Sequence, residues 1–238
     1  MSTIKPELYW KSRFPWVAAF AVTMGIFEAA LVVYLRAISY PDGFGFPLSP
    51  IPMRLLISEV LREFASLVMI TSVAVLSGRS KRERFAGFLI IFGIWDIVYY
   101  LFLLLLLGWP PSLFTWDVLF LIPVLWSAPV ITPVLVSCAM MFIGYRLIAN
   151  PPGENEARVM DKHSWLLLFA SAVVLFASFV WDYLRFVFDR ASGSFLEAAD
   201  NLIVEYVPVA FPWFVYGAGL ALSVLAGIYT GRRKKLGY

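Results

Sequence analysis

Six long apolar segments constrain the fold of this 238-residue chain more than any other feature. A helix rises about 1.5 Å per residue, so roughly 20 apolar residues cross a hydrocarbon core about 30 Å thick. Hydrophobic residues make up 61% of the chain and charged residues 15%, values typical of multi-span membrane proteins rather than soluble domains. We therefore expect one all-α transmembrane domain, residues 1–238, that crosses the membrane six times. The expected spans cover about 14–36, 54–77, 85–107, 117–147, 165–188 and 211–230.

The distribution of basic residues predicts how the chain is oriented. Most of its 19 Lys and Arg residues lie in segments that share one side of the membrane if both termini are on that side. Basic residues near the ends of spans are enriched on the cytoplasmic face, where they set orientation. We therefore expect a bacterial-type plasma (inner) membrane protein with both termini in the cytoplasm.

Two segments predict departures from straight spans. Residues 194–207 begin with an S-x-x-E capping box and carry one apolar face, which favours a short amphipathic helix on the outer surface before the last span. In the fourth predicted span, prolines remove backbone donors, so we expect that helix to kink or partly unwind. These prolines are Pro123, Pro129 and Pro133.

Charged side chains inside the predicted spans indicate a polar pocket. Glu59, Arg62 and Glu63 share one helix face, which cannot look at lipid because a charge at the bilayer centre costs at least about 2.5–3.5 kcal/mol. Counting about 1.5 Å per residue from the outer helix ends places five carboxylates from four spans in the outer half or near the midplane. The residues expected in one outer-facing pocket are Glu28, Glu59, Arg62, Glu63, Asp96, Tyr99, Tyr100, Asp182 and Arg185.

Internal pairing is the alternative explanation for some of these charges. The expected pairs are Arg62 with Glu59 or Glu63, and Arg185 with Asp182 or Asp189. Ion pairs at intervals of three or four residues form readily on a helix. Such pairs would fix helix packing without binding anything. Glu28 and Asp96 have no cation close to them in the sequence, which favours a functional role for both. Carboxylates also outnumber the two arginines, so the excess charge must be relieved by protons, a bound cation or water.

Three classes of function fit this pattern. The leading one binds or translocates a small solute, a cation or protons in the pocket. The second is an accessory or structural subunit of a larger membrane complex, and the third is a membrane enzyme acting on a lipid-linked or amphiphilic substrate. The sequence has no recognised nucleophile motif, phosphate loop or metal signature, and it identifies no catalytic residue.

The scarcity of histidine and cysteine limits the cofactors that the chain can hold by itself. With His163 as its one histidine, the chain cannot provide both ligands of a bis-histidine haem. With Cys138 as its one cysteine, it has neither an internal disulfide nor the Cys/His spacing of a zinc site. No cofactor and no nucleic-acid motif are identified from the sequence.

Expected partners are membrane lipid and another protein subunit. Gly219, Ser223 and Gly227 recur at intervals of four residues in the last span and form a small-residue face. Faces of this kind allow close approach of another helix. We expect this face to dock either a second copy of the chain or a partner subunit.

The segment GWPPSLFTWDVLFLIP, residues 108–123, together with Trp95-Asp96, resembles multi-span bacterial membrane proteins of unassigned function. The resemblance covers about the first four predicted spans. It implies a polytopic membrane protein, but no named family, activity or cofactor.

Overall fold

The computed structural model describes residues 6–50, 52–150, 159–190 and 203–230. Within them are six helices long and apolar enough to cross a membrane, which confirms the six predicted spans. The helices are α1 (Pro6–Ser39), α2 (Met53–Ser77), α3 (Lys81–Leu107), α4 (Ile131–Ala149), α5 (Lys162–Arg190) and α7 (Trp213–Thr230).

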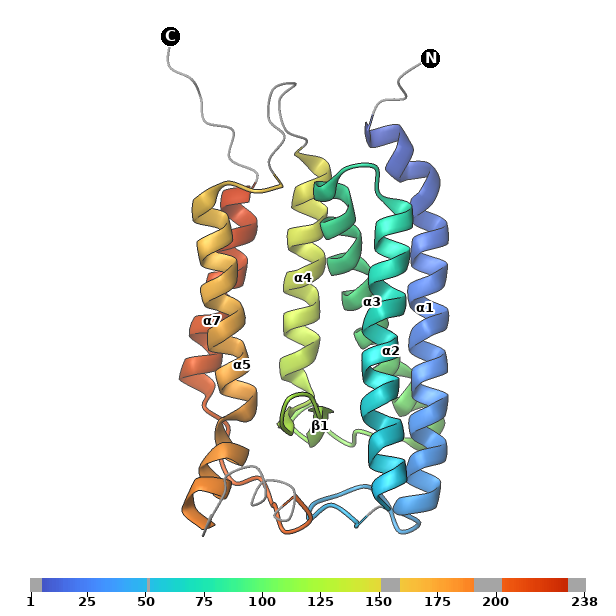
Figure 1. Cartoon of the computed structure of the whole chain (residues 1–238), viewed down its shortest axis with the longest axis vertical. Coiled ribbons are helices and arrows are strands. Elements are labelled where there is room, and N and C mark those ends of the chain that lie inside the picture. Colours follow the sequence, from blue (N-terminus) through green and yellow to red (C-terminus); the bar gives the residue numbers. More distant parts are fainter. Residues whose placement is uncertain (1–5, 51, 151–158, 191–202, 231–238) are drawn as a thin grey trace.

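The helices run along the long axis of one bundle (Figure 1). Helix α3 packs against α1, α2 and α4, whereas α7 packs against α4 and α5. Among the described residues, α5 packs along α7 and has no extensive contact with α2, α3 or α4. The start of α1 and the end of α7 lie at the same end of the bundle, which we call the terminal end.

A short β-hairpin lies inside the bundle toward the opposite end, which we call the hairpin end (Figure 1). Strands β1 (Trp116–Phe120) and β2 (Trp126–Pro129) pair antiparallel, with Trp116 opposite Pro129. The prediction that the fourth span begins at Asp117 is therefore wrong for residues 117–129, because α4 begins at Ile131.

The prolines explain this correction. Pro123 lies between the strands and Pro129 at the end of β2, positions where a missing backbone N–H leaves no helical hydrogen bond unmade. Pro133 is the third residue of α4, where backbone N–H groups have no intrahelical acceptor in any case. The prolines thus mark a hairpin and the first turn of a helix, and not kinks along one long span.

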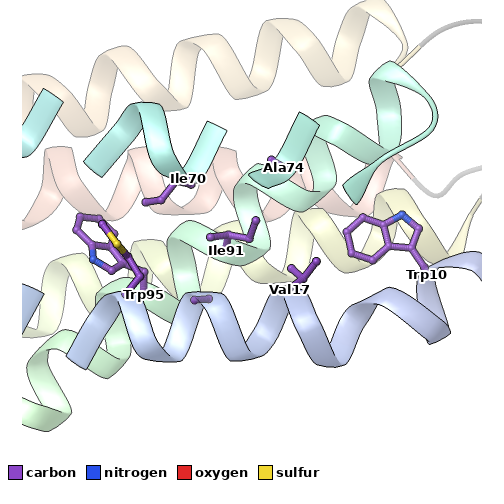
Figure 2. Packing of buried hydrophobic residues seen from close by; sticks show 8 residues of the cluster. Trp10, Val17, Ile70, Ala74, Ile91 and Trp95 are labelled. Atoms are coloured by element: carbon purple, nitrogen blue, oxygen red, sulfur yellow. The ribbon is translucent and has the colours of Figure 1, made fainter. Parts of the chain in front are cut away.

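Close approaches between glycines and backbone fix the position of α3. A Cβ atom on Gly25 of α1 would lie 2.7 Å from the Trp95 carbonyl oxygen, and one on Gly93 of α3 would lie 2.7 Å from the Ser137 carbonyl oxygen of α4. Both distances are too short for a side chain, so α3 is held tightly between α1 and α4. An apolar cluster that includes Trp10, Ile70 and Trp95 packs around the same helix on the α1 and α2 side (Figure 2).

The small-residue face of α7 is buried within the chain. A Cβ atom on Gly219 would lie 2.8 Å from Leu175 of α5, and one on Gly227 would lie 2.6 Å from Phe142 of α4. Ser223 is also buried. This face therefore packs against α5 and α4 and does not provide the exposed docking surface that the sequence suggested.

The predicted surface helix over 194–207 falls largely on residues 191–202, which lie outside the described residues. Its last part is described and is not helical, because residues 203–205 form a turn and the chain then runs without regular structure to 212. The turn ends beside Tyr206, whose side chain is fully buried in a cluster with Leu125, Tyr183 and Val187.

Candidate functional site

A cavity of about 640 Å³ lies inside the bundle, with α2, α3 and α4 on one side and α5 on the other. This volume is within the range of roughly 300–1,000 Å³ of small-molecule pockets. Most of its lining side chains are apolar. The charged residues that line it are Glu28, Arg36, Glu59, Arg62, Glu63, Asp96 and Asp117.

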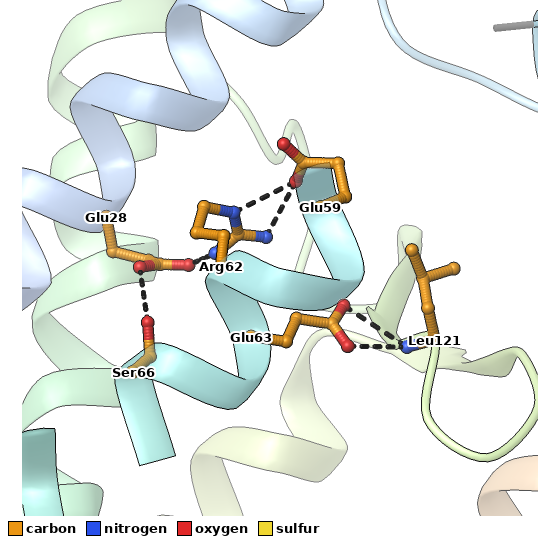
Figure 3. Close-up of polar contacts among 6 residues, drawn as sticks. All are labelled: Glu28, Glu59, Arg62, Glu63, Ser66 and Leu121. Carbon is orange, nitrogen blue, oxygen red and sulfur yellow. Dashed lines mark hydrogen bonds and ion pairs between the residues drawn. The ribbon is translucent and has the colours of Figure 1, made fainter. Parts of the chain in front are cut away.

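Arg62 joins two carboxylates from neighbouring helices (Figure 3). Its guanidinium donates to the Glu59 carboxylate of its own helix through Nε at 2.9 Å and Nη2 at 2.8 Å, and its Nη1 forms an ion pair with Glu28 of α1. Ser66, one turn further along α2, donates to Glu28 at 3.3 Å. The ion pair of Arg62 with Glu59 that the sequence predicts is present, and Glu28 is a second partner. Because Glu28 belongs to α1, Arg62 links α2 to α1.

Glu63 points away from this cluster and toward the hairpin (Figure 3). Both of its carboxylate oxygens accept from the backbone N–H of Leu121, at 3.2 and 3.0 Å. Its side chain is buried, with 6% of its surface exposed, and no ion pair involves it among the described residues. Glu63 therefore brings a carboxylate to the cavity wall with a neutral donor as its partner.

Asp96 has a similar environment on α3. Its Oδ2 accepts from the Ser137 hydroxyl of α4 at 2.9 Å, a contact that the close approach at Gly93 makes possible. Among the described residues, no arginine or lysine pairs with it. Asp96 is thus a second carboxylate on the cavity wall that has only a neutral donor.

Asp117 supplies a carboxylate that the sequence analysis did not place in the pocket. It lies on β1 with 2% of its surface exposed, forms an ion pair with Arg36 Nη2 at 3.2 Å, and accepts from the Tyr100 hydroxyl at 3.1 Å. Burial raises the pKa of the Asp117 carboxyl, and the positive charge of Arg36 opposes that shift. The pair holds the hairpin against the end of α1.

Arg36 is held in place by two aromatic rings. Its guanidinium carbon lies 3.7 Å from the centroid of Trp109 and 4.2 Å from that of Phe44. Stacking of this kind suits the planar, weakly hydrated guanidinium of arginine. The 40–50 loop, the end of α3 and the hairpin therefore meet at this one side chain.

The structure brings most of the predicted pocket residues together. Seven of them line the cavity: Glu28, Glu59, Arg62, Glu63, Asp96, Tyr99 and Tyr100. Arg36, Asp117 and Ser137 also line it, although they are not among the nine residues expected in the pocket. Asp117 was missed because it was assigned to the start of a helix, and the two prolines that follow it in the hairpin were the signal that could have corrected this.

Asp182 and Arg185 do not line the cavity, which corrects the expectation of one shared pocket. Asp182 is buried and accepts from the Tyr206 hydroxyl at 2.9 Å and from the backbone N–H of Val209 at 3.0 Å and of Ala210 at 3.2 Å. Its carboxylate thus fixes the segment between α5 and α7. The Arg185 side chain lies on the exposed face of α5.

The cavity has more acid than base. Five carboxylates and two arginines line it. Arg62 pairs with Glu28 and Glu59, and Arg36 pairs with Asp117. Glu63 and Asp96 are the two that form no ion pair with a cation of the described residues. This arrangement can hold protons or a positively charged group, because an isolated carboxylate is costly away from water.

Neither metal-site geometry nor comparison with known proteins assigns the site. In the part of the chain that the structure describes, no three His, Cys, Asp or Glu side chains are grouped so as to hold a metal ion. No family model, curated protein or solved structure matches this chain. The function is therefore argued from the cavity and the charges that line it.

Proposed function

We propose that this protein binds a small cationic solute in the cavity, from the outer side of a bacterial-type plasma membrane. The observation that carries the proposal is the pair Glu63 and Asp96. Both line a cavity of small-molecule size, and each has only a neutral hydrogen-bond donor as its partner among the described residues. A bound cation would supply the missing positive charge.

The basic residues of the connection between α2 and α3 support this orientation. Arg79, Lys81, Arg82 and Arg84 lie at the terminal end, and basic residues beside spans favour the cytoplasmic face. The hairpin end then faces outward. Cavity-lining residues at that end include Ser39 at the end of α1, Tyr40 after it, and Ser49 and Pro50 before α2. We therefore expect a solute from outside to enter there.

The remaining charges of the cavity act as supports for this site. Arg62 holds α2 against α1, and Arg36 holds the hairpin against α1 and α3. Both arginines form ion pairs with carboxylates, and the cavity keeps more carboxylates than arginines. The geometry therefore favours a cation over an anion as the solute.

Binding of tetramethylammonium to the purified full-length chain in lipid nanodiscs tests the proposal, with calorimetry as the readout. We expect Glu63→Gln and Asp96→Asn each to weaken binding about tenfold or more, which corresponds to about 1.4 kcal/mol. Matched controls are Glu205→Gln and Asp189→Asn, which change exposed carboxylates that do not line the cavity. Equal binding by all four variants would contradict the proposal.

A further inference from the structure

The cavity continues from the carboxylates toward the terminal end as an apolar slot between α4 and α5. We define this slot by the residues that line it: Leu89 and Phe92 of α3, Met140 and Ile143 of α4, and Leu168, Ala172 and Phe176 of α5. Leu89 precedes Asp96 by seven residues, so the slot reaches about 10 Å beyond that carboxylate along α3.

The two serine hydroxyls beside the slot are already hydrogen-bonded. Ser171 and Ser223 line the cavity, but the Ser171 hydroxyl donates to the Gly219 carbonyl at 2.8 Å, and the two hydroxyl oxygens are 2.5 Å apart. A small polar solute would find no free hydroxyl there. An apolar group gains by occupying such a space, because the slot offers water few hydrogen bonds.

The slot lies where the bundle is loosely joined. Helix α5 has no extensive contact with α2, α3 or α4 in the described part of the chain, and Figure 1 shows α4 in the space between α2 and α5. Ala172 both lines the cavity and is exposed. A ligand dissolved in the bilayer would therefore reach the slot beside Ala172.

We propose that the ligand is a single-chain cationic amphiphile, with its head group at Glu63 and Asp96 and its alkyl chain in the slot between α4 and α5. This inference rests on the proposed cation-binding function and adds the class of ligand. Charge complementarity selects the head group, since the two carboxylates form no ion pair among the described residues, and the apolar lining selects the chain.

Chain length gives the first test, on the unmodified full-length protein in nanodiscs. Tetramethylammonium is compared with octyl-, decyl- and dodecyltrimethylammonium, each at a free aqueous concentration corrected for uptake by empty nanodiscs. Burying one CH₂ contributes about 0.8 kcal/mol, so affinity should rise by up to about fourfold per methylene until the slot is filled. Dodecyl sulfate and dodecyl maltoside serve as anionic and neutral controls, and we expect both to bind at least tenfold more weakly.

Filling the slot gives the second test. Ala172→Phe should abolish the gain with chain length and leave tetramethylammonium binding unchanged. Val173→Phe is the matched control, because Val173 is the next residue of α5, is 50% exposed and does not line the cavity. Ala172→Leu repeats the test with a smaller side chain if the phenylalanine variant does not fold.

The outcomes separate the two proposals. If tetramethylammonium binds in a Glu63-dependent way but longer chains add nothing, the amphiphile inference is overturned and the cation site stands. Should none of the cations depend on Glu63, the proposed function fails as well. Equal affinity for dodecyl maltoside would indicate a site for neutral lipid and would also overturn the inference.

Discussion

Glu63, near the middle of α2, accepts the backbone N–H of Leu121 through both carboxylate oxygens, at 3.2 and 3.0 Å. Leu121 directly follows strand β1, where the pairing of the two strands ends. A side chain of one membrane-spanning helix thus satisfies a donor that the hairpin leaves unpaired. The contact also explains how non-helical backbone is accommodated next to the spans, since such backbone requires protein partners there.

This contact predicts a graded response at position 63. Glu63→Gln keeps an oxygen that can accept from Leu121, whereas Glu63→Ala leaves the buried N–H without an acceptor, at a cost of about 1–3 kcal/mol. We expect the alanine variant to melt at a clearly lower temperature than the glutamine variant in thermal unfolding in detergent micelles. Equal melting temperatures would show that the hydrogen bond does not stabilise the hairpin.

The buried ion pair between Arg36 and Asp117 predicts strong coupling. Arg36→Met leaves the Asp117 carboxylate without its cation and should destabilise the protein by about 3–5 kcal/mol. Adding Asp117→Asn removes the uncompensated charge and should recover part of that loss. A double-mutant cycle on unfolding free energies measures the coupling, and additive effects of the two changes would refute it.

The approach of α4 to α3 predicts that Gly93 cannot accept a side chain. A Cβ atom there would lie 2.6 Å from Met141 Cγ and 2.7 Å from the Ser137 carbonyl oxygen. We expect Gly93→Ala to destabilise the protein by about 1–3 kcal/mol, as overpacking does. It should also weaken cation binding, because Ser137 would move away from Asp96.

Gly217→Ala is the matched control for this substitution. Gly217 lies within α7, and nothing lies within 4 Å of a Cβ atom placed on it. Replacing a glycine by alanine in a helix stabilises it by up to about 1 kcal/mol when there is room. If the Gly93→Ala and Gly217→Ala variants have the same melting temperature, tight packing at Gly93 does not destabilise the alanine variant.

The hydroxyl of Tyr206 joins three segments and predicts a loss on its removal. It donates to Asp182 Oδ2 at 2.9 Å and lies 2.7 Å from the Ser127 hydroxyl of β2. Tyr206→Phe should cost about 1–3 kcal/mol, because buried partners lose a hydrogen bond. Thermal unfolding beside Tyr34→Phe, which changes a 67% exposed tyrosine, tests this. A loss no larger than that of the control would mean that the network is not stabilising.

The six spans could be predicted because transfer of a helix into lipid depends mainly on its own residues. The contact of Arg62 with Glu59 was predictable for the same reason, since two residues three positions apart on a helix lie on the same face. Both properties are local. Neither needs knowledge of which helices become neighbours.

Other features depend on tertiary contacts that residue counting does not provide. Depth along the axis placed Asp182 near the other carboxylates, but its direction around α5 turns it toward Tyr206 and the backbone before α7. The hairpin was missed because Trp116–Phe120 is largely apolar, as a helical span is, and its pairing with Trp126–Pro129 is a tertiary contact. The contacts of Asp117 with Arg36 and Tyr100 depend on the same strand, so the sequence did not predict them.

The way in which α5 is attached has a consequence for assembly during synthesis. Helices α1 to α4 make their mutual contacts within the first 150 residues, and α5 joins them mainly through α7 and β2. The last two helices therefore form a pair that docks on a preassembled four-helix unit. Co-expression of two fragments, cut in the connection between α4 and α5, should then reconstitute the bundle. The contact between α4 and α7 would form the main interface between the fragments.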